Sequence, residues 1–222
     1  MTPLLTQFDA SLKSLPVDTI GEARPEELDA IVALHLRAFP DTFITPLGKP
    51  MVQLYYQALM SYSGVCFIVY RNEAGGIVSF AVGVQSPSQF HHHLVLKYGC
   101  RAALTAVRCR PAALWSVMCR LSRRLLAPKN GDYGVYVDAE CASFAVDPLM
   151  RDPSIAAFLT AALIRALQSR GVANILSGVR VDNPRLLRFA RLFGYREVCR
   201  EMRPDGHEMQ ILIWSKNEEK VI

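Results

Sequence analysis

The stretch Ala145-Val146-Asp147-Pro148-Leu149-Met150-Arg151-Asp152-Pro153-Ser154-Ile155-Ala156 joins an apolar segment to the most regular helical pattern of the chain. The segment before it, 132–146, predicts a long strand. After it, apolar residues recur at helical spacing over 153–170, and Gly171 is typical of a helix C-terminus. Asp152 and Pro153 are a strong capping pair, because the carboxylate accepts a helix N–H and proline lacks one. These residues predict a strand, a turn and a helix.

The segments on either side predict a mixed α/β domain. The turn 72–76 lies between two apolar runs and predicts a β-hairpin. The strands expected from the whole pattern are 17–23, 64–70, 77–84, 132–146, 173–182, 195–201 and 208–214. One expected helix begins at Pro25. The others cover 50–61, 153–170 and 183–193. A length of 222 residues suits a single domain, 1–222.

The positive charge of the chain is concentrated in one segment. The whole sequence is 51% hydrophobic and 20% charged, which excludes wholesale disorder, and its net charge is +5. No acidic residue occurs between Glu73 and Asp132, and 87–131 contains eight Lys and Arg residues. Pro111 divides this segment into two expected amphipathic helices, 91–108 and 112–126. The rest of the chain is mildly acidic.

Three interpretations of the basic segment 87–131 remain open. Its helices can form a cap whose apolar faces pack on the domain. They can dock an anionic partner, either a phosphorylated acceptor or an acidic acyl-carrier protein. They can also attach the protein to an anionic membrane surface. Nucleic acid is not expected, because the segment has few aromatic residues and no known reader motif.

The sequence favours a cytoplasmic protein without a metal. The N-terminus has no basic start followed by an apolar run, so we expect no secretory signal. The uncharged stretch 50–70 is interrupted by polar residues and is expected to be soluble core. The six cysteines have no paired spacing, and His91–His93 has no partner at zinc-ligand spacing. We therefore expect reduced thiols and no metal site.

The motifs resemble those of the GNAT superfamily, the N-acyltransferases that move an acyl group from coenzyme A to an amine. The resemblance covers about 20–214 and is sharpest in 140–195. It is carried by Val146-x-Pro148, by Arg151 and Ala156 of the phosphate-binding motif, by Asn183 to Tyr195, and by the start of the first helix, 23–29. It implies an α/β (α+β) fold with a mixed, mostly antiparallel central sheet flanked by helices. The segment 87–131 is then a helical insertion between the third and fourth strands.

The resemblance also implies an activity. An acetyl or other acyl group would pass from acyl-CoA to the primary amine of a small molecule, such as an amino sugar or an amino-acid derivative. The reaction would be a direct attack in a ternary complex. An acyl-carrier protein as donor, and a catalytically silent binding module, are the alternatives.

The site residues follow from the same resemblance. Glu140 is the expected general base, with Asp138 on the same strand face as the second choice. The expected contacts of the cofactor are Phe144, Ala145, Val146, Arg151, Ser154, Ile155, Ala156 and Asn183. The expected contacts of the acceptor are His35, Phe39, Asp41 and Tyr55. For His35 and Asn183 the alternatives are a satisfied core histidine and a simple helix cap.

Two motifs depart from the family pattern. Ser154 stands where the phosphate-binding turn has glycine, and the Asp152 carboxylate can occupy the N–H groups that a pyrophosphate needs. Ala190 stands where the family often has the tyrosine that protonates the leaving thiolate. Ser154, Cys141, Tyr136 or solvent would have to replace that tyrosine.

Overall fold

The computed structural model describes residues 8, 15–16, 18–42, 44–109, 133, 136–150, 152–203 and 206–216. Its centre is a seven-stranded sheet in the order β1-β2-β3-β4-β5-β7-β6. All neighbouring strands are antiparallel except β4 and β5, which are parallel. The strands are β1 (Ile20–Glu22), β2 (Val65–Arg71), β3 (Ile77–Gln85), β4 (Ala139–Val146), β5 (Asn174–Arg180), β6 (Arg196–Met202) and β7 (Glu208–Ser215). The expected mostly antiparallel mixed sheet is confirmed.

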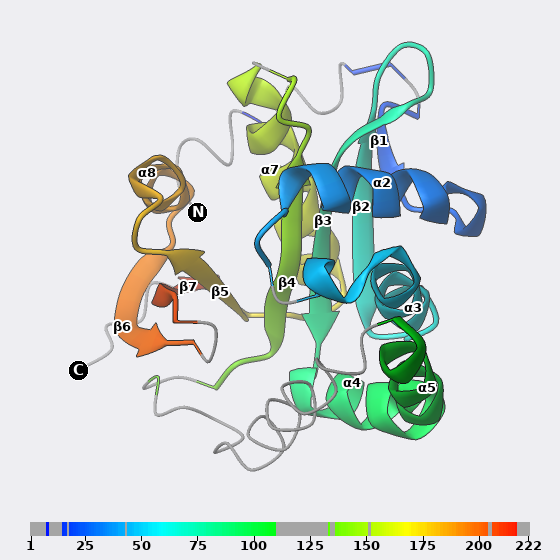
Figure 1. Cartoon of the computed structure of the whole chain (residues 1–222). Coiled ribbons are helices and arrows are strands. Elements are labelled where there is room, and N and C mark those ends of the chain that lie inside the picture. The colour runs from blue at the N-terminus through cyan, green and yellow to red at the C-terminus, as the bar shows by residue number, and fades with distance from the viewer. Residues whose placement is uncertain are drawn as a thin grey trace.

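Helices cover both faces of the sheet (Figure 1). We call the face under α2 and α3 the front face and the face under α7 the back face. The helices are α2 (Leu28–Ala38), α3 (Lys49–Met60), α4 (Pro87–His93), α5 (Gly99–Cys109), α7 (Pro153–Ser169) and α8 (Pro184–Leu192). Short turns of other helix types are η1 (Pro25–Glu27), η2 (Thr45–Leu47) and the π-helical η3 (Leu94–Tyr98). None of the described helices is long and apolar enough to cross a bilayer.

The core consists of two apolar layers, one on each face. On the back face, leucines of α7 pack on the sheet over β2, β3 and β4. On the front face, Val32 of α2 and Tyr56 of α3 pack on Phe67, Phe80 and Val82 of the sheet. The back layer is especially close at Gly83, where an added Cβ would lie 2.8 Å from Cδ1 of Leu167. Glycine at this position therefore lets α7 approach β3.

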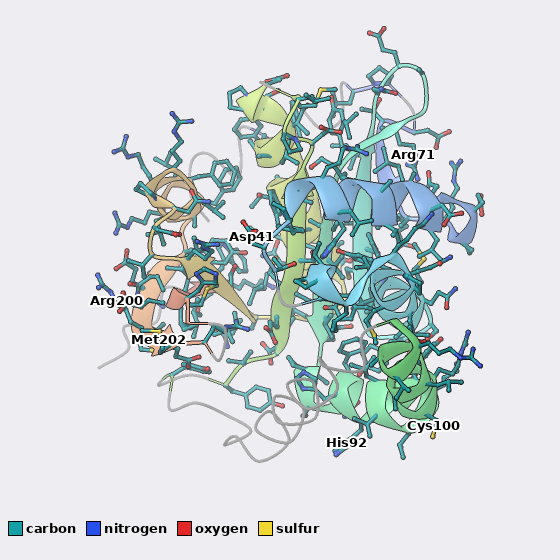
Figure 2. All side chains as sticks on the ribbon, in the orientation of Figure 1. Asp41, Arg71, His92, Cys100, Arg200 and Met202 are labelled. Carbon is teal, nitrogen blue, oxygen red and sulfur yellow. The ribbon has the colours of Figure 1, made fainter. Side chains whose placement is uncertain are left out.

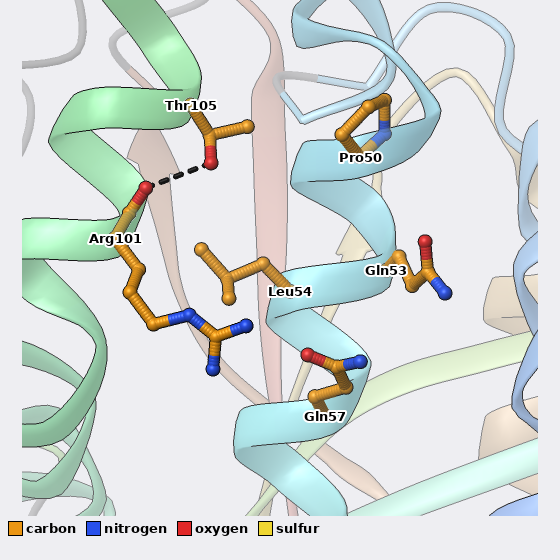
Figure 3. A pocket seen from close by; sticks show the side chains of 6 residues that line it. All are labelled: Pro50, Gln53, Leu54, Gln57, Arg101 and Thr105. Atoms are coloured by element: carbon orange, nitrogen blue, oxygen red, sulfur yellow. Dashed lines mark hydrogen bonds between the residues drawn. The ribbon is translucent and has the colours of Figure 1, made fainter.

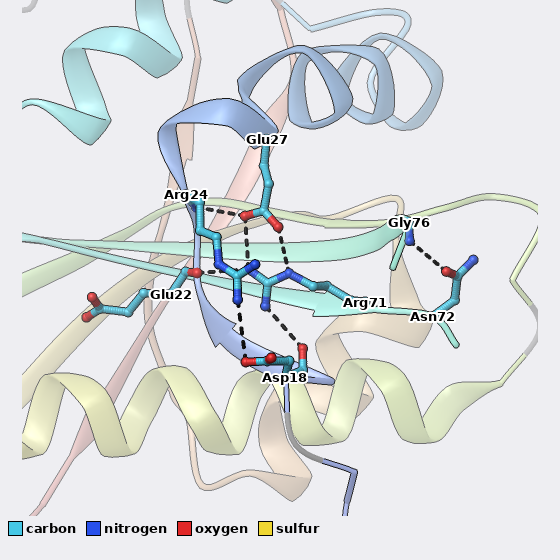
Figure 4. A network of polar contacts seen from close by, with 7 residues as sticks. All are labelled: Asp18, Glu22, Arg24, Glu27, Arg71, Asn72 and Gly76. Carbon is cyan, nitrogen blue, oxygen red and sulfur yellow. Dashed lines mark hydrogen bonds and ion pairs between the residues drawn. The ribbon is translucent and has the colours of Figure 1, made fainter. Parts of the chain in front are cut away.

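Two ion pairs, one of them buried, fix the chain around the sheet. Arg71, only 6% exposed, donates from Nε and Nη2 to both carboxylate oxygens of Glu27 and from Nη1 to the carbonyl oxygen of Asp18 (Figure 4). Arg37 at the end of α2 lies 2.6 Å from Asp147, which follows β4. The N–H of Leu149 and this guanidinium lower the pKa of Asp147. The turn after β4 is thereby tied to α2.

Several expected boundaries are confirmed and others are wrong. The hairpin of β2 and β3 and the helix α7 lie where the pattern predicts them. The strand expected over 132–146 begins only at Ala139, and 136–138 are outside it. The first strand is also shorter than expected, because Asp18 has a left-handed φ of 71° and β1 starts at Ile20.

The basic segment 87–131 begins as a helix packed on the domain. The chain from α4 through η3 to α5 is helical, and Tyr98 and Ala106 pack against Met51, Leu54 and Ala58 of α3. The opposite side of this helix leaves Leu96, Leu104 and Val107 exposed. The helix expected over 112–126 lies outside the described residues. So does the expected division at Pro111.

Candidate active site

Among the described residues, β4 pairs with β5 only over its first three positions. The last pair joins Cys141 to Ser177, and beyond it the two strands diverge (Figure 1). Against β3 the register of β4 shifts beside Ala142, which is a β-bulge. An unpaired strand edge offers its backbone N–H and C=O groups to an extended ligand chain. We call 142–146 the free edge of β4. It contains Phe144, Ala145 and Val146, the expected contacts of a pantetheine arm.

The side chains of β4 alternate between the two faces of the sheet. Cys141 and Phe144 belong to the back layer. Glu140 pairs with Val84 and Ser143 pairs with Val82, and both valines belong to the front layer. Glu140 and Ser143 therefore point to the front face, on either side of the bulge.

A chain of hydrogen bonds leads from Ser143 into the front layer. The hydroxyl of Tyr56 lies 3.1 Å from Oγ of Ser143 and 2.8 Å from Nδ1 of His35. Nε2 of His35 lies 3.2 Å from Oγ1 of Thr45, and Thr45 donates to the carbonyl oxygen of Phe39 at 2.6 Å. Because the Thr45 proton goes to this carbonyl, Thr45 accepts from Nε2–H of His35 and Nδ1 accepts from Tyr56. Ser143 then donates to Tyr56 and keeps lone pairs for a ligand.

His35 is thus a link in a buried chain, as its position on the apolar side of α2 allows. It is 4% exposed, and burial lowers its pKa to about 4, so the imidazole is neutral near pH 7. Phe39 ends α2, and its ring centroid lies 5.0 Å from that of His35. The ring of Tyr55 contacts that of Tyr56. Asp41 is exposed and is labelled in Figure 2.

The two candidate bases have different surroundings. No described residue forms a hydrogen bond or ion pair with the carboxylate of Glu140, which lies on the front face. Asp138 lies before β4 begins, so its expected place on the same strand face is wrong. Its Oδ2 accepts the backbone N–H groups of Ala173 and Asn174 at 2.9 and 2.8 Å. These bonds hold the start of β5 beside β4, which is a structural task.

The N-terminus of α7 is capped by its own chain. Oδ1 of Asp152 accepts the N–H of Ser154 at 2.8 Å, and Pro153 at the first helical position has no N–H. The hydrogen bonds from the Ser154 hydroxyl and N–H lower the pKa of Asp152, so the carboxylate stays charged. Of the first three residues of α7, 153–155, only Ile155 has a backbone N–H that is left for an anion. Arg151 lies outside the described residues, and Ala156 lies one position further into the helix.

The N-terminus of α8 is capped in a similar way to that of α7. The buried side of α8 carries no side chain that could protonate a leaving thiolate. Oδ1 of Asn183 accepts the N–H of Leu186 at 3.1 Å. Ala190 is buried in the back layer and presents no hydroxyl. Burial raises the pKa of the Cys141 thiol to about 12, and this side chain faces the back layer. Tyr136 is 70% exposed.

The described part of the chain has no metal-ligand cluster, and the hollow between α3 and α5 is separate from the site on β4. Within the described ranges no three His, Cys, Asp or Glu side chains gather as metal ligands would. A hollow of about 230 Å³ lies between α3 and α5 and is lined by Leu54, Gln57 and Arg101 among others (Figure 3). None of its lining residues belongs to β4 or β5.

The fold can be compared with known structures, whereas no protein-family model and no curated protein matches the sequence. The ribosomal-protein-S18-alanine N-acetyltransferase of Escherichia coli matches at 15% identity and a TM-score of 0.56, over 91% of this chain and 96% of that one. A GNAT-family protein of Desulfovibrio desulfuricans matches at 11% identity and 0.56, over 88% and 97%. The chain has the GNAT fold. The yncA protein of Salmonella typhimurium, solved with its cofactor acetyl-CoA, matches at 14% identity and 0.58, over 91% and 95%.

Within this GNAT fold, sequence reasoning missed three participants. Tyr56 and Ser143 are 87 positions apart and meet only after α3 packs on the front face of the sheet. Thr45 closes the same chain of bonds from η2. The one available signal was the paired aromatic residues at 55–56, of which the first was nominated and the second carries the hydrogen bonds.

Proposed function

We propose that this protein is an N-acyltransferase that moves an acetyl or longer acyl group from an acyl-CoA to the primary amine of a small molecule. Amino sugars and amino-acid derivatives are the acceptor classes. The observation that carries the proposal is the free edge of β4. Ser143 on this edge and Glu140, in the paired start of the same strand, project to the same front face. An extended donor arm along this edge would have both side chains beside it.

Glu140 takes the proton of the attacking amine in this proposal. An amine attacks a thioester only as the free base, so its ammonium form must first lose a proton. The carboxylate of Glu140 has no described partner to compete for that proton. Ser143 accepts a second N–H of the amine, because its own proton points toward Tyr56. These two contacts orient the nitrogen toward the free edge.

The leaving thiolate takes its proton from solvent. A simple thiol has a pKa of about 8.5, so its thiolate is protonated by water-borne acid near neutral pH. Ala190 offers no proton, and the Cys141 thiol faces the back layer. This assignment predicts a modest rate for the step and no dependence on a single acidic side chain.

The residues of β4 suit coenzyme A, whereas those at the start of α7 suit it poorly. A bound acyl-CoA would supply the thioester carbonyl that the amine attacks. Phe144, Ala145 and Val146 would hold the pantetheine arm through backbone groups. The Asp152 carboxylate repels a pyrophosphate and takes the N–H of Ser154. The donor therefore depends mainly on the strand.

The same observation favours a second donor, an acyl-carrier protein. Its prosthetic arm ends in a single phosphate diester on the carrier, so no pyrophosphate has to reach α7. Lys97, Arg101 and Arg108 are exposed on the described part of 87–131 and suit an acidic carrier surface. This donor would use the same free edge of β4 and the same Glu140.

Release of free thiol with both donors tests the proposal. The purified chain is mixed with a panel of primary amines and either acetyl-CoA or acetylated carrier protein, and thiol release is followed with a colour reagent. Turnover with acetyl-CoA supports the main proposal, and turnover with the carrier alone supports the second. Absence of turnover with both donors, together with absence of acetyl-CoA binding at millimolar concentration in calorimetry, would leave only the silent binding module.

A further inference from the structure

Arg203 lies over β5 at the point where β5 leaves β4. It follows β6, and its Nη2 lies 3.2 Å from the place where a Cβ on Gly178 would be. Gly178 is the first residue of β5 after the last β4–β5 pair, Cys141 with Ser177. A larger residue at 178 would crowd the guanidinium, so glycine leaves the room in which it lies. Figure 2 labels Met202, the residue before Arg203, at the end of β6.

The guanidinium of Arg203 forms no hydrogen bond or ion pair with the residues that the structure describes. Its Nε is buried and makes no hydrogen bond, and no described residue forms an ion pair with it. The neighbouring Arg200, by contrast, donates to Gln210 at 3.2 Å and lies 3.8 Å from Glu208. A buried charged donor without a partner is costly and rare in proteins. An anionic ligand would remove that cost.

Arg203 and Glu140 lie on the same face of the sheet. Gly178 and Leu176 are two positions apart on β5, and Leu176 pairs with Glu140. Leu176, Gly178 and Glu140 therefore all face the front. The carboxylate of Glu201, also at the end of β6, accepts the hydroxyl of Tyr133 at 3.0 Å. Among the described residues, a carboxylate and a guanidinium without ion-pair partners thus flank the point where β4 and β5 diverge.

We propose that Arg203 binds a carboxylate on the acceptor, so that the acceptor is an amino acid or a related amino carboxylate. This inference rests on the proposed acyl transfer and names the acceptor class for it. The amine is directed to Glu140 and Ser143, and the carboxylate forms a charge-assisted pair with the guanidinium. Arg203, a cation without an ion-pair partner in the described part of the chain, matches a monoanion. A phosphate dianion would call for more positive charge on this face than Arg203 supplies.

The test compares acids with their amides. The probes are the twenty common amino acids and their carboxamides, with acetyl-CoA as donor, for the protein and its Arg203→Gln and Arg203→Lys variants. We expect kcat/KM for the best acid to exceed that of its amide by at least about 10-fold. R203Q should lower kcat/KM for the acid about 10- to 100-fold and abolish the preference for the acid over its amide. R203K, which keeps the charge and loses the planar fork, should retain part of it.

The matched control is Arg196→Gln, which removes an exposed arginine from the opposite end of β6. R196Q should keep the preference for the acid, and thermal unfolding should show that all variants are folded. Equal rates for acids and amides, or an unchanged preference in R203Q, would overturn the inference and leave the acyltransferase proposal standing. The inference would also be overturned if amines that lack a carboxylate were the better substrates. Absence of turnover with every amine would sink the proposed function and this inference together.

Discussion

The hydroxyl oxygen of Tyr56 lies 3.1 Å from Oγ of Ser143 and connects the buried side of α3 to the free edge of β4. The same oxygen lies 2.8 Å from Nδ1 of His35. One phenol thus fixes the rotamer of Ser143 and satisfies a buried imidazole. Through this bond, the packing of the front layer determines which atoms β4 presents to a ligand.

Removal of that hydroxyl should destabilise the protein and impair the site. Tyr56→Phe leaves Nδ1 of His35 buried without a donor and frees Ser143 to rotate. We expect a loss of about 1–3 kcal/mol in the free energy of unfolding, measured by urea denaturation. Tyr136→Phe removes an exposed hydroxyl and is the control, with a change below about 0.5 kcal/mol. Equal small effects in both variants would contradict the buried hydrogen-bond chain.

The buried histidine should make stability depend on pH. Burial lowers the pKa of His35 from 6.5 to about 4, so the unfolded chain binds a proton first as the pH falls. Stability from this group is complete above the unfolded pKa and is lost as the pH falls below 6.5. Between pH 6.5 and 5 the loss should be about 2 kcal/mol, measured by urea denaturation at each pH. His35→Gln should flatten this slope, whereas His92→Gln, an exposed histidine, should keep it.

How much the sequence predicts depends on how far apart the interacting residues are. The β2–β3 hairpin and α7 follow from patterns within 20 residues, and their bounds are nearly as expected. Glu140 is expected as a base because the resemblance places one six residues before Val146, and this role stays a prediction. The expected strand position of Asp138 is wrong. Its carboxylate accepts the N–H groups at 173 and 174 just before β4 begins, and no local pattern shows this contact with a distant segment.

Contacts between distant segments had no sequence signal. Ser143 is an ordinary small residue in a strand until α3 brings Tyr56 to it. Gly178 and Arg203 lie close together only because the sheet places β5 and the end of β6 on either side of β7. The self-capping of α7 by Asp152 is the opposite case, since cap and helix are adjacent and the prediction is confirmed.

The close approach of α7 to β3 predicts a sensitive glycine. Gly83→Ala would place a Cβ 2.8 Å from Leu167 and 3.1 Å from Leu163, both in the back layer. Relief requires movement of packed side chains, so we expect a loss of about 1–3 kcal/mol in urea unfolding. Gly99→Ala in α5 is the matched control, because the nearest atom is at 4.0 Å and alanine favours a helix. A neutral G83A would show that α7 shifts freely on the sheet.

Glu140 should govern the rate of acyl transfer. Glu140→Gln keeps the shape of the side chain and removes the proton acceptor, so kcat should fall about 10²- to 10⁴-fold. The loss should shrink toward high pH, where more of the amine is already the free base. The measurement is kcat against pH from 6 to 10, with Glu73→Gln in the β2–β3 turn as the control. A kcat for E140Q equal to that of the unaltered protein at pH 7 would remove Glu140 from the mechanism.

The capping carboxylate at α7 should weaken coenzyme A binding by its charge. Asp152→Asn keeps an oxygen that caps Ser154 but removes the charge that faces the phosphates, and Asp152→Gly removes both. We expect D152N to tighten acetyl-CoA binding about tenfold, or about 1.4 kcal/mol, and D152G to tighten it further because the Ser154 N–H is released. Calorimetry at low and high salt checks both steps, since added salt should reduce the gain of D152N. Asp29→Asn on α2 is the charge-matched control. Weaker binding in D152N would mean that the carboxylate helps to hold the donor and that the opposing charge was misjudged.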